Sequence, residues 1–427
     1  MSFTATVFQN EYLPAGSGEV HAIVTVDAGD AAVAAVAPSE RSIVLIVDTS
    51  GSMSSPMSKI HAARQAVAAA VDELPDGVNF AIVSGFHEAT LMYPRSGRDL
   101  VAASETTRAD AREVASNLDP SGGTAISTWL QLARELFDGH AGIKLAYLLT
   151  DGKNESESAD RLTEELARCA GQFQCDARGV GDQWVVDELR RITSTLLGQV
   201  DIIKEPDLMD DDFRDFMARA LGKTIGDVRL QVWAPQGANI RYVKQVAPSI
   251  EDLTALAEPA DTLTNTYPTG AWAPGESRDY HVCIDVPPGE VGDERLAARI
   301  MLALDGEVTQ TSLVKSIFTG DHALTTRIDP QVAHYTGQAE LATAIREGLA
   351  ARRDGDEAEA TVKLGRAVQL AHESGNESTV RLLAKVVEVE DPAAGTVRLK
   401  KKVETIDEME LDTRSTRTVR VTPKGGA

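Results

Sequence analysis

One part of the 427-residue chain alternates between two apolar patterns, and this alternation constrains the fold more than any other feature. Residues 42–48 (SIVLIVD) form a continuous apolar run that is typical of a strand buried on both faces. Apolar residues then recur at helical spacing over 60–74. The exchange of strand and helix continues to residue 221 and predicts a parallel sheet covered on both faces, a doubly wound α/β domain. Further strands are predicted over 78–86, 144–150, 173–181 and 199–204, and further helices over 107–118, 124–137, 158–170, 184–196 and 210–221.

A different pattern begins at residue 227, where polar and apolar residues alternate with a period of two as far as 318. Turn sequences such as Pro287-Pro288-Gly289 divide this region into segments of strand length. The pattern predicts an antiparallel β-sandwich. Residues 3–26 hold two alternating runs joined by a turn-rich segment, which is typical of a β-hairpin. We expect this hairpin to join the sandwich, so that the α/β domain is inserted between its strands.

The C-terminal part of the chain changes character twice. Helical spacing over 332–351, 357–374 and 376–389, with short loops between, predicts a small bundle of antiparallel helices. The tail has few large apolar residues and no period, so we expect it to be disordered. The predicted organisation is a hairpin at 1–38, an α/β domain at 39–222, a β-sandwich at 223–325, a helical bundle at 326–390 and a disordered tail at 391–427.

Acidic residues outnumber basic ones, since 65 Asp and Glu stand against 42 Lys and Arg and give a net charge of −23. This surplus argues against a nucleic-acid partner, because a polyanion would be repelled. The first residues lack the basic and apolar regions of a secretory signal, and the apolar runs are too short to span a bilayer. Three scattered cysteines indicate reduced thiols. We therefore expect a cytoplasmic protein with neither a membrane nor a nucleic-acid partner.

Five oxygen-bearing side chains stand where predicted strands end or a predicted helix begins. Asp48, Ser50 and Ser52 follow the first apolar strand. Thr124 begins a predicted helix, and Asp151 follows another strand. In an open α/β sheet, the loops at the carboxyl ends of the strands meet at one crevice. Carboxylate and hydroxyl oxygens suit Mg²⁺, Mn²⁺ or Ca²⁺ better than Zn²⁺ or copper, so the sequence predicts a site for a hard divalent cation.

These residues resemble the metal-ion-dependent adhesion site (MIDAS) of von Willebrand factor A (VWA) domains, which combines Asp-x-Ser-x-Ser with a later Thr and Asp. The sequences GGTAI, LLTDG and GVGD also fall in the order expected for that family, and the resemblance covers residues 41–222. It implies that the two serines and Thr124 bind the metal directly. The two aspartates would bind it directly or through water. An Asp or Glu of a protein partner would complete the coordination.

By this resemblance, the chain is a non-enzymatic, metal-dependent protein-binding module that acts as a scaffold or regulator and uses Mg²⁺, or Mn²⁺ or Ca²⁺. Bacterial relatives with this plan work beside AAA+ ATPases or kinase–phosphatase signalling systems. Two other classes stay open: a regulatory subunit of an AAA+ ATPase or chelatase-like complex, and a metal-dependent hydrolase. The hydrolase needs a general base near the ion, and the motif loops contain neither a histidine nor a spare glutamate.

Plainer interpretations exist for the shorter motifs. The Asp-x-Ser-x-Ser string alone also fits a helix N-cap. A phosphoacceptor role for Asp48 lacks the second carboxylate common at such sites, and a serine hydrolase or nucleotide-binding role lacks GxSxG or GxxxxGK[ST]. His281 stands at strand spacing beside Cys283, and we interpret His281 as a packing residue rather than a metal ligand.

Threonines gather in the tail among acidic and basic neighbours. Such a segment can be a substrate for a Ser/Thr kinase, because phosphate adds strong acceptors that a partner's arginines can bind. It also resembles segments recognised by forkhead-associated domains, and the alternative is an unmodified, solvated tail. The predicted phosphorylation sites are Thr405, Thr413, Thr416 and Thr418.

Overall fold

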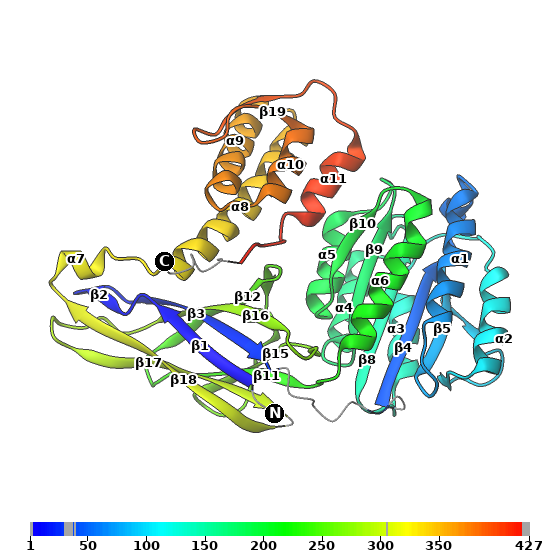
Figure 1. The fold of residues 1–427 in the computed structure, drawn as a ribbon, viewed down its shortest axis with the longest axis horizontal. Helices are drawn as coiled ribbons and strands as arrows, with labels where there is room; N and C mark the ends of the chain where they lie inside the picture. Colours follow the sequence, from blue (N-terminus) through cyan, green and yellow to red (C-terminus); the bar gives the residue numbers. More distant parts are fainter. Residues whose placement is uncertain (1–2, 30–36, 38–39, 305, 421–427) are drawn as a thin grey trace. The chain divides into compact units, whose positions relative to one another are not determined.

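The computed structural model describes residues 3–29, 37, 40–304 and 306–420. The chain divides into two compact units. Unit 1 comprises Met1–Ala31, Asp227–Thr269 and Pro274–Ala427. Unit 2 comprises Ala32–Gly226 and Gly270–Ala273. Figure 1 shows unit 2 as a sheet with helices, and unit 1 as β-sheets with a group of helices.

Unit 2 is built on one sheet with the strand order β10-β9-β8-β4-β5-β6, in which β7 also pairs with β5. The strands from β10 to β5 are parallel, as the apolar runs predict. The edge strands β6 and β7 are antiparallel and were not predicted. The bounds are β4 Arg41–Asp48, β5 Asn79–Gly85, β6 Thr90–Tyr93, β7 Val101–Ala102, β8 Ile143–Thr150, β9 Gln174–Val180 and β10 Val200–Ile203.

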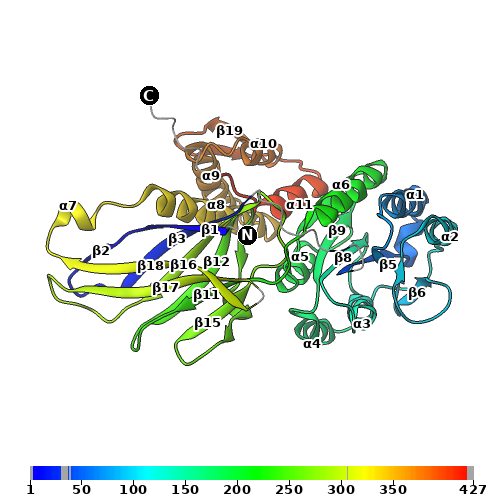
Figure 2. The same ribbon diagram turned by 60° about the horizontal axis from the view of Figure 1, so that its bottom comes forward.

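Helices cover both faces of this sheet, with α1 and α6 on one face and α3 and α4 on the other (Figure 2). Every residue of β4 is buried, which explains its continuous apolar run. The helical spacing after β4 is confirmed, since the predicted apolar positions of α1 lie in the core under that face. The bounds are α1 Ser58–Asp72, α2 Glu105–Ser116, α3 Ile126–Phe137, α4 Ala159–Cys169, α5 Val186–Thr195 and α6 Met209–Gly222.

Unit 1 contains two larger sheets, of order β1-β3-β16-β12-β13 and β14-β15-β11-β17-β18-β2. The N-terminal strands β1 and β3 form an antiparallel hairpin, and β3 pairs with β16 although more than 200 residues separate them in sequence. The bounds are β1 Phe3–Gln9, β2 Tyr12–Pro14, β3 Glu19–Ala28, β11 Val228–Trp233, β12 Asn239–Ala247, β13 Glu251–Asp252, β14 Glu258–Pro259, β15 Thr264–Pro268, β16 Ser277–Asp285, β17 Glu294–Leu304 and β18 Glu307–Thr319.

The helices of unit 1 follow these sheets. The predicted third helix of the bundle ends at Val386, and the chain continues as a strand because it pairs there with a later segment. The bounds are α7 His322–Thr325, α8 Pro330–Arg353, α9 Glu357–Glu373, α10 Glu377–Val386, β19 Val387–Asp391, β20 Thr396–Leu399 and α11 Thr405–Arg414.

The prediction of a disordered tail over 391–427 is wrong for its described part, which ends at residue 420. This part forms β20 and the helix α11. Leu411 is fully buried and joins the core of the bundle together with Val397. Glu410 is buried but forms ion pairs with Lys385 at 2.7 Å and Arg414 at 2.6 Å. A few apolar contacts and paired charges therefore order the segment. Its composition alone does not indicate these contacts.

Candidate functional site

The predicted site lies where the strand order of unit 2 reverses. From β4 the chain passes to β5 on one side and then crosses to β8 on the other, so β4 and β8 are neighbours with a switch point between them. Asp48 ends β4, and Asp151 directly follows β8. The carboxyl ends of parallel strands at such a point flank the crevice where α/β proteins commonly bind ligands.

Asp48 is fully buried and fixed through both carboxylate oxygens. Its Oδ1 accepts a hydrogen bond from the backbone N–H of Ser50 at 2.7 Å, and its Oδ2 accepts one from the Thr150 hydroxyl at 2.5 Å. Burial raises the pKa of Asp48 to about 6, although these hydrogen bonds act in the opposite direction. The orientation of the carboxylate is therefore fixed, and its ionised form is unfavourable in free energy without a cation nearby.

The hydroxyls of the first loop connect this loop to the third. Ser50 Oγ lies 2.8 Å from Ser52 Oγ. The Ser52 hydroxyl donates to Asp151 Oδ1 at 2.6 Å. Asp151 is fully buried, and Ser50 is 2% exposed. Side chains that are 99 residues apart in sequence thus share one hydrogen-bonded chain of oxygens.

Thr124 reaches the same place from the second loop. A Cβ atom added at Gly152 would lie 3.2 Å from Ser52 Oγ, 3.4 Å from Thr124 Oγ1 and 3.9 Å from Ser50 Oγ. The three hydroxyls therefore converge on one small space beside Gly152, and a side chain at that position would fill it. All five sequence-predicted residues meet here, and we call Asp48, Ser50, Ser52, Thr124 and Asp151 the loop cluster.

Backbone hydrogen bonds hold the first and second loops against each other. The N–H of Gly51 donates to the carbonyl of Gly122 at 2.9 Å, and that of Ser121 donates to the carbonyl of Thr49 at 2.6 Å. Gly122 has a φ of +72°, and a Cβ there would meet the His87 ring at 2.4 Å. The loop therefore requires glycine at this position for its conformation and for its packing.

Comparison with known proteins identifies the family. A family model described as von Willebrand factor type A domain matches residues 41–202, and one described as von Willebrand factor type A C-terminal domain matches 369–415. A solved structure of von Willebrand factor type A from Catenulispora acidiphila is 46% identical, with a TM-score of 0.92, and the match covers 98% of this chain and 97% of that one. The chain belongs to the von Willebrand factor type A family.

Two solved structures of low sequence identity share the fold alone. The ArnB paralog VWA2 from Sulfolobus acidocaldarius matches over 98% of both chains, with 14% identity and a TM-score of 0.61. The human COPII-coat protein Sec24c matches with 10% identity and a TM-score of 0.52, over 89% of this chain and 57% of that one. A search of curated proteins found no match.

A lysine ammonium group also contacts the loop cluster, and the sequence analysis did not identify it. Lys59, in the first turn of α1, lies with its Nζ 2.6 Å from Asp151 Oδ2, and its side chain is only 11% exposed. A lysine seven residues after Ser52, on the helix that follows the Asp-x-Ser-x-Ser loop, is the sequence signal that was available. Because the neighbouring Asp48 is also buried, this ammonium offsets part of the negative charge in the cluster.

The tail threonines of this VWA protein lie in different surroundings. Thr405 is exposed at the start of α11. Thr413 is only 1% exposed. Thr416 and Thr418 are half-buried. The Thr416 carbonyl accepts a hydrogen bond from the backbone N–H of Ile250, and the Thr418 hydroxyl donates one to the carbonyl of Val246 in β12. Thr405 is therefore the most exposed of the four threonines.

No helix in the described part of this VWA chain combines the length and apolar character needed to cross a membrane.

Proposed function

We propose that this protein is a non-enzymatic protein-binding module of the MIDAS type. The loop cluster would hold a divalent cation, Mg²⁺ first and Mn²⁺ or Ca²⁺ as substitutes, and the cation would bind an Asp or Glu of a protein partner. The observation that carries the proposal is the convergence of the three hydroxyls beside Gly152, next to two buried carboxylates.

The donor set fits a hard cation. Its ligand atoms are hydroxyl and carboxylate oxygens, which Mg²⁺ and Ca²⁺ prefer over nitrogen and sulfur. The three hydroxyls carry no charge, so most of the compensation for the ion falls to the two aspartates. A cation in this space would also compensate the buried carboxylate of Asp48, whose charged form burial disfavours.

Charge balance favours an acidic ligand. Two carboxylates and the Lys59 ammonium leave the cluster with one net negative charge, and a divalent cation changes it to one net positive charge. Mg²⁺ takes about six oxygen ligands, which is more than the hydroxyls supply, so water or an incoming oxygen completes the shell. A partner carboxylate gains charge pairing there that a neutral ligand does not.

Affinity capture tests this function. The protein is immobilised in Mg²⁺ or in EDTA, and a cell extract is passed over wild type, Ser50→Ala and the matched control Ser55→Ala, whose serine is an exposed neighbour outside the pattern. We expect a partner that is held by wild type and by the control in Mg²⁺ only, and that is absent from Ser50→Ala. Capture that persists in EDTA and in Ser50→Ala would contradict the proposal.

For the C-terminal segment we propose phosphorylation of Thr405 by a Ser/Thr kinase, with a forkhead-associated domain as the reader. Thr405 is exposed at the first position of α11, where a phosphate is favoured by the helix dipole. Mass spectrometry of protein co-expressed with its native kinases should find phosphate on Thr405 and none on Thr413. Phosphate on Thr413 alone would contradict this assignment.

We also propose a cytoplasmic location, and two other functions have their own tests. Cytoplasmic location is supported by three free, buried cysteines. A role as regulatory subunit of an AAA+ ATPase or chelatase-like complex is the alternative to a free-standing scaffold, and co-purification of an ATPase with the captured partner would favour it. Turnover of a substrate that is abolished by Asp48→Ala would favour a hydrolase instead.

A further inference from the structure

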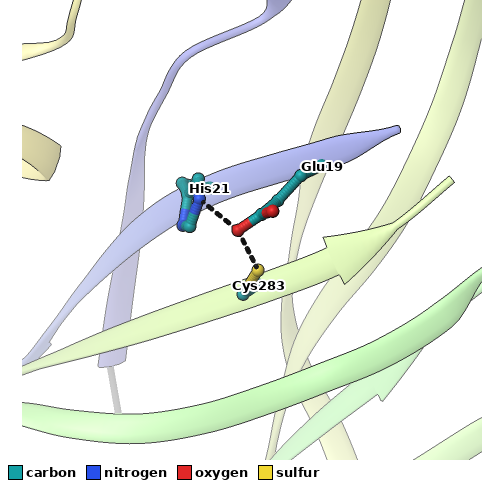
Figure 3. A group of neighbouring side chains, drawn as sticks. All are labelled: Glu19, His21 and Cys283. Atoms are coloured by element: carbon teal, nitrogen blue, oxygen red, sulfur yellow. Dashed lines mark hydrogen bonds and ion pairs between the residues drawn. The ribbon is translucent and has the colours of Figure 1, made fainter. Parts of the chain in front are cut away.

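A second group of possible metal ligands lies on the sheet of unit 1, outside the loop cluster. Glu19 and His21 are on β3, and Cys283 is on β16 (Figure 3). One carboxylate oxygen, one imidazole nitrogen and the thiol sulfur lie within 4.8 Å of one another. We propose that Glu19, His21 and Cys283, here called the strand cluster, bind one Zn²⁺ ion or another borderline divalent cation such as Co²⁺.

Strand pairing brings the three residues together. Cys283 is directly opposite His21 in the antiparallel pair of β16 and β3. Side chains of directly opposed residues project from the same face of a sheet. Glu19 is two residues from His21, so it lies on that face as well. The cluster therefore rests on regular backbone geometry, which holds ligands more rigidly than a mobile loop.

The spacing of the ligand atoms is close to what zinc needs. His21 Nε2 lies 2.9 Å from Glu19 Oε1, and Cys283 Sγ lies 3.6 Å from the same oxygen. Tetrahedral zinc with its usual bond lengths places N, O and S ligands about 3.3–3.7 Å apart. The two distances from Glu19 Oε1 are therefore within about 0.5 Å of these values, and the third pair, His21 and Cys283, lies within 4.8 Å. The mixed sulfur, nitrogen and oxygen set favours Zn²⁺ over Mg²⁺.

A neighbouring imidazole supports the orientation of His21. His281 Nε2 lies 3.0 Å from His21 Nδ1, and the Tyr242 hydroxyl lies 3.3 Å from both nitrogens. A hydrogen bond from His21 Nδ1–H to His281 Nε2 leaves the lone pair of His21 Nε2 for a metal.

An arginine holds the remaining oxygen of the carboxylate. Arg241 lies 2.6 Å from Glu19 Oε2 and 2.7 Å from Asp285 Oδ1, so Glu19 Oε1 is the oxygen turned toward His21 and Cys283. The Cys283 side chain is fully buried, whereas the His21 and Glu19 side chains are 28% and 40% exposed. An ion can therefore enter from the exposed side, where a fourth position is left for water.

Cobalt substitution tests the proposal because a thiolate ligand gives Co²⁺ a strong near-ultraviolet absorption that oxygen ligands do not. Excess Mg²⁺ is present throughout, so that the loop cluster is offered its preferred ion. The variants are Cys283→Ser, His21→Ala and the matched control Cys169→Ser, whose cysteine is buried in unit 2. Equilibrium dialysis against Zn²⁺ gives the stoichiometry.

We expect the thiolate–cobalt absorption in wild type and in Cys169→Ser, with one Zn²⁺ per chain. The absorption should vanish in Cys283→Ser, and Zn²⁺ affinity should fall at least tenfold in His21→Ala. If Cys283→Ser fails to fold, Glu19→Gln, at a half-exposed position, should give a similar loss of affinity. Absence of the absorption in folded wild type, or its persistence in folded Cys283→Ser, would show a hydrogen-bonded cluster without a metal and overturn the proposal.

Discussion

The loop cluster of unit 2 and the strand cluster of unit 1 gather their ligands in opposite ways. In the first, the loops after β4 and β8 and the loop before α3 bring hydroxyls and carboxylates together. In the second, regular pairing of two strands places a carboxylate, an imidazole and a thiol side by side. The difference teaches that the loops of this protein supply hydroxyl and carboxylate oxygens, the donors that a hard cation prefers, whereas its strand face supplies a softer set. We therefore expect the two sites to bind different ions.

The largest effect is expected from Lys59→Met, which removes the cation beside the loop cluster. The metal-free protein should lose about 3 kcal/mol of stability, because a buried carboxylate then lacks its partner. Saturating Mg²⁺ should restore most of this loss by replacing the missing positive charge. Urea unfolding in EDTA and in Mg²⁺ measures both values, and Lys153→Met, at an exposed position in the loop after β8, is the control. An equal loss in both buffers would contradict this role.

Asp48→Asn tests whether the two clusters bind metal ions independently. It removes one of two carboxylate charges from the loop cluster while keeping the shape of the side chain, so Mg²⁺ affinity should fall about 100-fold, at the upper end of losses seen for supporting ligands. The thiolate–cobalt absorption of the strand cluster should not change. Titration calorimetry gives the first value and absorbance the second, with the exposed Asp182→Asn as control. Loss of both signals would mean that one site accounts for both.

Gly152→Ala tests the geometry of the loop cluster without changing its charge. The added methyl group would lie 3.2 Å from Ser52 Oγ and 3.4 Å from Thr124 Oγ1, inside the space proposed for the ion. We expect Mg²⁺ affinity to fall about 30-fold, which corresponds to the ~2 kcal/mol typical of overpacking. Gly222→Ala is the control, since a Cβ there meets nothing. Unchanged affinity in Gly152→Ala, measured by calorimetry, would place the ion elsewhere.

The smallest effect is expected at His281, a positioning residue of the strand cluster. His281→Phe should weaken Zn²⁺ binding about tenfold, since it removes the acceptor that orients His21. His281→Gln, which can still accept a hydrogen bond, should recover part of this affinity. Competition with a zinc chelator measures all three proteins, and thermal unfolding checks their folding. If His281→Phe and His281→Gln lower the affinity for Zn²⁺ equally, the role of His281 is packing alone.

Much of unit 2 could be predicted from the sequence because its signals are local. The continuous apolar run of β4 and the helical spacing after it depend on neighbours in the chain, and both are confirmed. The loop cluster followed from one general rule, since strand ends in a parallel sheet meet at one edge. The antiparallel edge strands β6 and β7 were missed because they are short and partly exposed.

The described part of the tail was predicted wrongly for a physical reason. Its order depends on Leu411 in a distant core and on the pairing of buried Glu410 with Lys385. Composition counts such an acidic residue as evidence for disorder, although a paired charge can be buried. The interpretation of His281 as a packing residue stays a prediction, and it considered only the strand that holds this residue, although His281 also contacts His21 of β3.

The sequence by itself determined the alternation of strands and helices in unit 2, the five oxygen-bearing residues of the loop cluster and the family to which they point. These features depend on residues that are close together in the sequence, where the period of the apolar residues reports the backbone conformation. Only the tertiary structure decided that Lys59 pairs with Asp151, and that Cys283 lies opposite His21. Those contacts join residues about 90 and 260 positions apart, and side chains so distant become neighbours only when burial of the core and strand pairing fix the path of the chain.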